Sequence, residues 1–179
     1  EELAYGCSGI QTSMTANTLG LTPIKLAGSE EQKKKYFGWL MSEPTWVSYA
    51  TTEPGAGSDV AGMQCRATKQ ADGSYVLNGT KAWITNGGIA DVHVVVASVD
   101  PELKSKGQAS FIVPPGTKGL SMGQKYKKHG IRASHTSEVV LDDVKVPGSC
   151  LLGGKDKLDQ KLARARENQA TGKQPAMAT

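Results

Sequence analysis

The stretch "QCRATKQADGSYVLNGTKAWIT", residues 64–85, sets the fold class that we expect for this chain. Runs of strand-forming residues are separated by Asp72-Gly73 and Asn78-Gly79, and both dipeptides are typical of two-residue hairpin turns. The stretch therefore predicts an antiparallel meander made of QCRATKQ, SYVLN and TKAWIT.

Further strand-like runs surround this meander. They are TWVSYATT (45–52), DVHVVVASV (91–99), ASFIV (109–113), a short run near LSMGQK (120–125), and SEVVLDDVKV (137–146). Pro114-Pro115 and Pro147 end two of them. About seven or eight strands are enough for a small antiparallel barrel or sandwich.

Helical patterns flank the strands on both sides. Apolar residues recur at steps of three and four over residues 3–21, and Pro23 is expected to end that helix. Ser29-x-x-Gln32 is a capping box, so a second helix begins there and ends near Leu40. After Pro147 one thin helical face carries Leu158, Leu162 and Ala165, and residues 167–175 have the composition of a linker.

We therefore expect an α+β fold in which N-terminal helices precede an antiparallel β-barrel or sandwich domain and a short helical tail. The expected parts are residues 1–44, the end of a helical domain, residues 45–147, the β-domain, and residues 148–179, a linker with the start of another helical domain. The first ten residues, EELAYGCSGI, have no initiator Met and no signal-peptide pattern, so we expect the chain to begin inside a helix.

Composition narrows the function. The chain has 179 residues, of which 38% are hydrophobic and 21% charged, and no run of about 18 apolar residues that would span a membrane. The net charge of +4 is spread out without interleaved aromatic residues, so phosphate-bearing small molecules are better candidate ligands than nucleic acid. Cys7, Cys65 and Cys150 are too widely spaced for a disulfide framework or a zinc site, which indicates a reducing compartment and no metal centre.

Two glycine-rich stretches are candidate binding sites. In "YATTEPGAGSDVAG" (49–62) a strand delivers Thr51 and Thr52 to a turn, and Gly55, Gly57 and Ser58 offer donors to a phosphate or a polar ring edge. The alternative is a loop that only turns the chain, with Asp59 capping the next element.

The second stretch is "KAWITNGG" (81–88). Trp83 and Thr85 share one face of a strand by its period of two, so an indole and a hydroxyl could meet a flat cofactor together. The alternative is a core tryptophan beside a surface threonine.

Taken jointly, these motifs resemble the acyl-CoA dehydrogenase family of flavoproteins. "YATTEPGAGSDVAG", "LNGTKAWITNGG" and "VVLDDVKVP" are similar to its signature segments, and "LAYGCSGIQTSMTANTLGLTPI" and "GSEEQKKKYFGWL" to the end of its N-terminal helical domain. The resemblance covers roughly residues 3–154. Two departures concern His135, where many relatives have Asp, and a tail over residues 155–176 that is longer than usual.

The resemblance implies specific roles. FAD would be bound by a first segment with Tyr49, Thr51, Thr52, Gly57 and Ser58, and by a second with Trp83, Ile84 and Thr85. Ser58 would also lie near the substrate's thioester arm, Ser105 would contact its CoA part, and residues 11–18 would line the acyl pocket. No residue here matches the family's catalytic glutamate, and we expect Glu53 to accept backbone hydrogen bonds or face outward.

The implied reaction is the FAD-dependent α,β-dehydrogenation of an acyl-CoA thioester, with electrons passed to an electron-transfer flavoprotein. The resemblance also implies a homo-oligomer, a dimer or tetramer, in the bacterial cytoplasm or the mitochondrial matrix. Three alternatives stay open: an acyl-CoA oxidase or flavin monooxygenase on the same scaffold, a flavin- or acyl-CoA-binding module without catalysis, and a nucleic-acid binder acting through the basic tail. The rate at which oxygen reoxidises the reduced flavin would separate the oxidase, and a salt titration of DNA binding would test the last.

Overall fold

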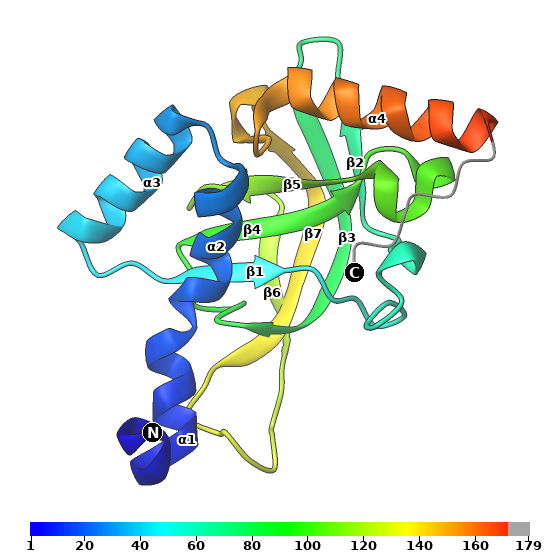
Figure 1. Ribbon diagram of the computed structural model, residues 1–179. Coiled ribbons are helices and arrows are strands. Elements are labelled where there is room, and N and C mark those ends of the chain that lie inside the picture. The colour runs from blue at the N-terminus through cyan, green and yellow to red at the C-terminus, as the bar shows by residue number, and fades with distance from the viewer. Residues whose placement is uncertain (172–179) are drawn as a thin grey trace.

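A curled sheet forms the middle of the molecule in the computed structural model, which describes residues 1–171 (Figure 1). Three helices lie beside the sheet and a fourth crosses one end of it. The helices are α1 (Glu2–Thr15), α2 (Asn17–Ala27), α3 (Glu30–Ser42) and α4 (Gly154–Ala170). The strands are β1 (Val47–Ala50), β2 (Arg66–Lys69), β3 (Tyr75–Thr85), β4 (Val92–Ser98), β5 (Gln108–Val113), β6 (Leu120–Lys125) and β7 (Thr136–Val146). Short 3₁₀ turns are η1 (Val60–Gly62), η2 (Pro101–Gly107) and η3 (Gly148–Cys150).

The order of elements confirms the expected helices, β-unit and helical tail, but the sheet is mixed. Its strand order is β1-β4-β2-β3-β7-β6, with β5 on β4. The expectation of a purely antiparallel sheet is wrong because β4 runs parallel to β1, with Val47 opposite Val92, and parallel to β2 at its end. The long connection from β1 to β4 contains a whole hairpin, so the chain can return and enter β4 in the same direction as β1.

The hairpin predicted at Asp72-Gly73 is confirmed. It joins β2 to β3 with Lys69 opposite Tyr75, and Gly73 has φ +80°. The amide and hydroxyl of Ser74 both donate to the Asp72 carboxylate, which stabilises the turn.

The hairpin predicted at Asn78-Gly79 is wrong, because SYVLN and TKAWIT form the single strand β3. Gly79 has φ +143° and lies where the pairing of β3 with β7 shifts register, so it marks a bulge. A Cβ at Gly79 would lie 2.9 Å from the Cα of Cys65. The glycine therefore serves a close approach of two backbones and not a turn.

The helix boundaries differ from the predictions in three places. The first predicted helix is two helices that meet at Ala16, and α2 continues through Pro23 to Ala27, because packing of its buried Gly20 and Ile24 holds it. The capping box at Ser29 is confirmed, although α3 runs to Ser42. Helix α4 runs to Ala170, so the predicted linker over 167–175 is wrong for its first residues, and its part beyond 171 lies outside the described residues.

Two apolar clusters hold these elements together. One lies within the curled sheet and reaches α4, with Leu77, Phe111 and Leu158 among its members. The other lies between the sheet and helices α2 and α3, and includes Ile24, Tyr36 and Ile112. Every residue of β4 is buried, so this strand supplies both clusters. Each fully buried large apolar side chain stabilises the fold by about 1.5–3 kcal/mol relative to exposure.

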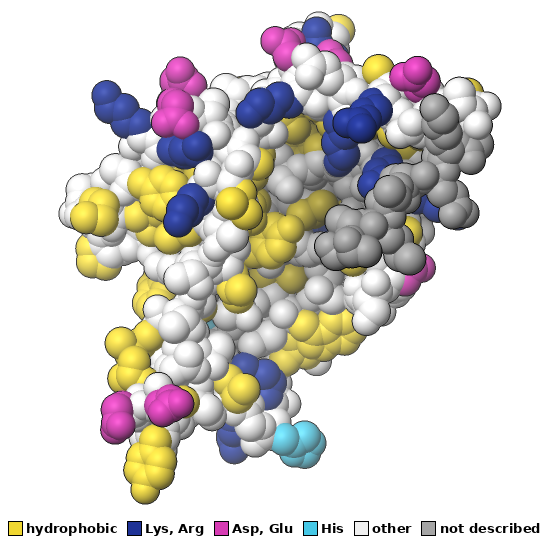
Figure 2. Space-filling model, in the orientation of Figure 1, with side chains coloured by type: hydrophobic (Ala, Val, Ile, Leu, Met, Phe, Trp, Pro, Cys, Tyr) yellow, Lys and Arg dark blue, Asp and Glu magenta, His cyan; other side chains and the backbone are white. Residues whose placement is uncertain are grey.

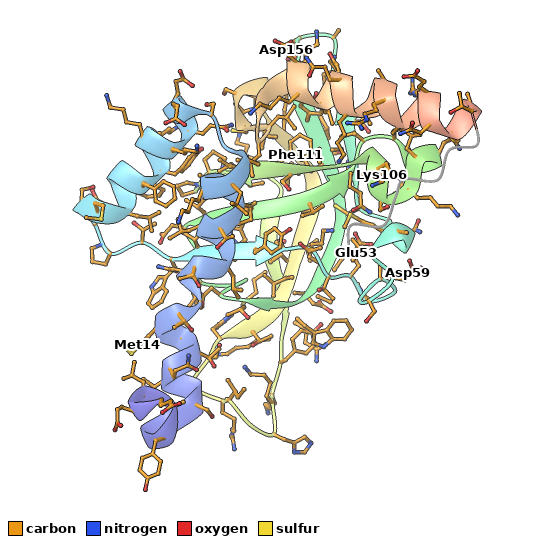
Figure 3. All side chains as sticks on the ribbon, viewed as in Figure 1. Met14, Glu53, Asp59, Lys106, Phe111 and Asp156 are labelled. Atoms are coloured by element: carbon orange, nitrogen blue, oxygen red, sulfur yellow. The ribbon has the colours of Figure 1, made fainter. Side chains whose placement is uncertain are left out.

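The N-terminal helices also leave apolar side chains in contact with solvent. Figure 2 shows hydrophobic side chains along α1 and over α3, and the exposed ones include Leu3, Ile10, Met14, Leu19 and Met41. Met14 projects away from the sheet in Figure 3. Among the described residues, no helix has the length and apolar character needed to cross a membrane.

Candidate flavin site

The first candidate segment follows β1 directly and folds into a small closed turn. Glu53 and Ala56 exchange two backbone hydrogen bonds of 3.1 Å, which bends the chain at Pro54-Gly55. A Cβ built on Gly55 or Gly57 would meet no atom within 4 Å, so both backbones face open space. Ser58 is exposed as well, so this turn presents its backbone and the Ser58 hydroxyl to solvent.

The second segment is the end of β3 and the turn after it. A register shift against β7 falls between Lys81 and Ile84, and Trp83 has φ +56° within it. The sequence predicted that Trp83 and Thr85 share one face. In the structure Trp83 is exposed, Ile84 is buried and Thr85 is half-buried, but the bulge at Trp83 interrupts the period of two, so the shared face stays a prediction.

The two segments lie side by side. The Ala82 amide donates to the Thr52 carbonyl at 2.9 Å, and the Lys81 ammonium donates to the Thr51 carbonyl at 3.0 Å. Segments about thirty positions apart in the sequence therefore meet where the first has just left β1 and the second is still within β3. This is the juxtaposition that a shared ligand requires, although the individual site residues remain predictions.

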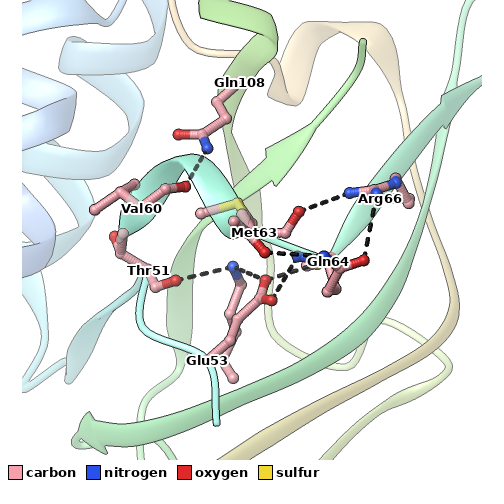
Figure 4. A network of polar contacts seen from close by, with 10 residues as sticks. Thr51, Glu53, Val60, Met63, Gln64, Arg66 and Gln108 are labelled. Atoms are coloured by element: carbon pink, nitrogen blue, oxygen red, sulfur yellow. Dashed lines mark hydrogen bonds and ion pairs between the residues drawn. The ribbon is translucent and has the colours of Figure 1, made fainter. Parts of the chain in front are cut away.

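Glu53 lies at this junction and is buried, and Figure 4 shows its polar contacts. Its carboxylate accepts the amides of Gln64 at 2.6 Å and Cys65 at 2.9 Å, and it pairs with the Lys81 ammonium at 2.9 Å. Burial alone would raise the pKa of Glu53, but the hydrogen bonds from Lys81 and from the two amides outweigh it and hold the pKa below its usual value. The prediction that Glu53 accepts backbone hydrogen bonds is confirmed.

The sequence reasoning missed Lys81. Its side chain is fully buried at 0% exposure, among the largest fully buried side chains of the described residues. The available signal was its position, a charged residue two places before Trp83 inside a strand that is otherwise buried on one face.

Tyr126 is the second residue that the sequence did not reveal. Its ring stacks on the Trp83 indole with centroids 5.9 Å apart and planes inclined by 16°. The Tyr126 hydroxyl donates to Glu138 at 3.2 Å. Burial is the first cause that raises the pKa of Tyr126, and the Glu138 carboxylate adds to it. The partner of Trp83 lies over forty positions away, so no local pattern could reveal it.

The remaining predicted residues fall in four places. Tyr49 is exposed on β1, whereas the Ile84 side chain is buried in the sheet cluster, so only its backbone is available to a ligand.

Ser105 is exposed in η2, which packs against η1, and the Gln108 side chain donates to the Val60 carbonyl at 2.6 Å. Asp59 lies just before η1, which contacts η2, and Figure 3 labels both Asp59 and Lys106 of η2. Residues 11–18 lie at the α1–α2 junction, where the Asn17 side chain bonds the backbone of Thr45 and Val47.

His135, the departure noted in the sequence, lies close to this region. Its carbonyl accepts the Asn86 amide at 3.0 Å, so it borders the turn after Trp83. Burial and then the nearby Lys125 and Lys128 lower the pKa of His135, which favours the neutral imidazole at neutral pH.

The donor set fits a flavin. The Thr51 hydroxyl is buried and has no hydrogen-bond partner in the described part of the protein, so it is available to a polar ring edge. The open backbones at Gly55 and Gly57 suit a pyrophosphate, and the Trp83 indole suits a flat ring. Among the described residues, no group of three or more His, Cys, Asp or Glu side chains is arranged to hold a metal ion.

Comparisons with known proteins agree with this arrangement. The acyl-CoA dehydrogenase middle-domain family matches residues 48–144, and its N-terminal domain family matches residues 1–43. The chain is 45% identical over 156 residues to the probable medium-chain specific acyl-CoA dehydrogenase 2, mitochondrial, of Caenorhabditis briggsae, covering 86% of this chain and 38% of that protein.

Solved structures show the same relationship. The butyryl-CoA dehydrogenase of Megasphaera elsdenii has a TM-score of 0.80 at 33% identity, over 97% of this chain and 51% of that chain. An acyl-CoA dehydrogenase complexed with FAD from Bacillus anthracis has a TM-score of 0.75 at 40% identity, over 88% of this chain and 26% of that chain. The chain thus spans about half or less of these relatives' lengths, and it belongs to the acyl-CoA dehydrogenase family.

Proposed function

We propose that this chain forms the FAD- and acyl-thioester-binding part of an acyl-CoA dehydrogenase. The observation that carries the proposal is the hydrogen bond between Ala82 and Thr52, which brings the two flavin segments together. A relative solved with FAD and relatives named for butyryl-CoA and medium-chain substrates support it.

In this proposal the residues of the chain position the cofactor and the substrate, and the cofactor carries out the redox chemistry. Thr51 and Thr52 hydrogen-bond the polar edge of the ring, Trp83 covers its face, and Thr85 lies near its reactive nitrogen. Ser58 binds the pyrophosphate or the thioester arm. When bound, FAD supplies the acceptor for the hydride that leaves the β carbon of the acyl chain.

The substrate enters along η2, where exposed Lys104, Ser105 and Lys106 offer a hydroxyl and two cations to the CoA phosphates. The acyl chain extends toward the α1–α2 junction. An electron-transfer flavoprotein takes up the electrons, and the protein acts as a homo-oligomer in the bacterial cytoplasm or mitochondrial matrix.

The proton-abstracting base is proposed to lie outside this chain. Glu53 is the tempting candidate, but its carboxylate is already engaged by Lys81 and two amides, and these hydrogen bonds outweigh burial and lower its pKa. A general base must reach the substrate proton and have a pKa near the working pH. Glu53 therefore has a holding role.

Binding is tested by titrating FAD into the 179-residue chain and following the quenching of flavin fluorescence. We expect saturable binding that weakens about tenfold in Trp83→Ala, the loss of one aromatic contact of about 1–1.5 kcal/mol. Trp46→Ala is the matched control, because Trp46 is also exposed but precedes β1. Equal weakening by both variants would remove Trp83 from the site, and no binding by the wild type would end the proposal.

Catalysis is tested separately, by mixing the chain with FAD, an acyl-CoA series and a dye acceptor. We expect no turnover by this chain alone and turnover once a helical C-terminal domain is supplied. Turnover by this chain alone that Glu53→Gln abolishes at saturating FAD would make Glu53 the base and overturn its assigned role.

A further inference from the structure

The most unusual side chain in the described part of the protein is Lys81. Its ammonium is fully buried within the sheet, and it bonds the Thr51 carbonyl at 3.0 Å and the Glu53 carboxylate at 2.9 Å. Removing an ammonium and a carboxylate from water is costly, and an apolar pair of similar volume often holds a fold equally well. Stability alone is therefore a weak reason for an ion pair here.

The geometry of the ion pair indicates what it does. Lys81 precedes Ala82, whose amide donates to the Thr52 carbonyl. Two consecutive residues of β3 therefore each donate a hydrogen bond to one carbonyl of the first flavin segment. The Lys81 ammonium, on its four-carbon stem, donates to the Thr51 carbonyl, which accepts no backbone amide in the described part of the chain. These two hydrogen bonds hold the first segment against β3 immediately before Trp83.

Glu53 connects the same interactions to a third segment, the entry to β2. Its two carboxylate oxygens accept the amides of Gln64 and Cys65, at the entry to β2, in addition to the ammonium. Cys65 in turn packs against the backbone of Gly79 on β3. One ion pair therefore ties together the turn after β1, the entry to β2 and the middle of β3 (Figure 4).

We propose that Lys81, with Glu53 as its counter-ion, is a positioning residue that sets the spacing between the Thr51-Thr52 carbonyls and Trp83, and through it the affinity for the flavin. This inference rests on the proposed function, because it takes the same two segments as the cofactor site. Lys81 acts through the first segment and is not expected to touch the cofactor.

The experiment separates positioning from stability. Lys81→Met alone leaves a buried carboxylate without its cation, so the variant to use is Lys81→Met combined with Glu53→Gln, which removes both charges and keeps the shapes. The control is Lys145→Met, which removes the exposed ion pair between Lys145 and Asp72 at the other end of the sheet. Each chain is measured for thermal unfolding, for FAD affinity by fluorescence quenching, and for hydrogen exchange of the Ala82 amide in the ligand-free state.

We expect the double variant to remain folded, to exchange the Ala82 amide at least about tenfold faster than the wild type, and to bind FAD about tenfold more weakly, because a slightly misplaced ligand-holding segment is costly. The Lys145→Met control should match the wild type in all three. A double variant with wild-type FAD affinity and wild-type Ala82 exchange would overturn the proposal.

Two other outcomes are also decisive. If the double variant does not fold, Glu53→Gln alone is measured in the same way; unchanged Ala82 exchange and FAD affinity in that variant would count against the ion pair. If the wild type binds no FAD, the proposed function fails. Exchange of the Ala82 amide still tests whether Lys81 and Glu53 hold the first segment in place.

Discussion

Two ion pairs of this protein have nearly the same length and opposite surroundings. Lys81 and Glu53 meet at 2.9 Å with side chains that are 0% and 5% exposed, whereas Lys145 and Asp72 meet at 2.8 Å with side chains that are 58% and 57% exposed. Each pair lies near a glycine with positive φ, Gly79 for the buried pair and Gly73 for the exposed one. Distance alone therefore does not decide what an ion pair contributes: burial and the number of other hydrogen bonds do.

The largest expected effect comes from breaking the buried pair on one side. Lys81→Met leaves Glu53 buried and charged, so we expect the free energy of unfolding to fall by about 3–5 kcal/mol. Urea unfolding followed by circular dichroism measures it. Lys145→Met should have the same urea midpoint as the wild type within error. Equal losses of unfolding free energy in the two variants would show that burial does not distinguish the two ion pairs.

The glycines beside the two pairs should differ in the same direction. Gly79→Ala places a Cβ 2.9 Å from the Cα of Cys65 at φ +143°, and we expect it to cost about 2–4 kcal/mol. Gly73→Ala meets open space at φ +80°, so only the backbone strain of about 1–2 kcal/mol applies. Matched urea titrations of the two variants decide this, and a larger loss at Gly73 would contradict the close packing at Gly79.

The two carboxylates should differ in their response to salt. Hydrogen bonds from Lys145 and Ser74 lower the pKa of Asp72, whereas burial raises the pKa of Glu53 and is outweighed by the hydrogen bonds from Lys81 and two amides. A lowered folded pKa gives stability that is present above the unfolded value, about 3.9 for Asp and 4.3 for Glu, and is lost as pH falls through the folded value.

This contrast is measured by following the free energy of unfolding between about pH 6 and pH 2, with and without added salt of about 0.5 M. We expect Glu53→Gln to cost about 3–5 kcal/mol at the upper pH in both salts, because it leaves the buried Lys81 ammonium without its counter-ion, and to flatten the acid side of the curve. The contribution of Asp72 should disappear in salt, because its pair is exposed. Salt sensitivity of the Glu53 contribution would contradict its burial.

The smallest effect concerns another exposed contact, the stack of Tyr126 on Trp83. Tyr126→Leu should cost about 0.5–1.5 kcal/mol at most and change the fluorescence of Trp83, because the indole loses an aromatic neighbour. Tyr5→Leu, at an exposed residue of α1, is the control. An unchanged spectrum would show that the two rings do not stack in solution.

Much of the architecture could be predicted from local patterns. The capping box at Ser29 and the Asp72-Gly73 turn follow from short-range hydrogen bonds, which depend only on neighbouring residues. The strands of residues 92–98 and 136–146 follow from their apolar content and alternation. The two candidate segments could be singled out because glycine, threonine and tryptophan at such spacing are well suited to binding a flat, phosphorylated ligand.

Features that the patterns could not supply depended on partners distant in the sequence. Asn78-Gly79 has the same composition as a turn, but Cys65 lies against Gly79 and the chain continues straight through a bulge. Pro23 has the composition of a helix end, but packing of α2 against β1 carries the helix past it. The parallel pairing of β1 with β4 was missed because strand direction is set by how a connection returns and not by the strand's own residues.

Local sequence was thus sufficient for the element types and their order, the capping box at Ser29, the Asp72-Gly73 turn, and the choice of the two candidate segments, since each of these rests on contacts within a few residues. The folded sheet alone established that Thr52 and Ala82 are bonded, that Trp83 stacks on Tyr126, and that Lys81 and Glu53 are buried together. The physical reason is that a charged side chain enters a core only when the fold brings its counter-ion and donors to the same place, and that coincidence belongs to the whole sheet.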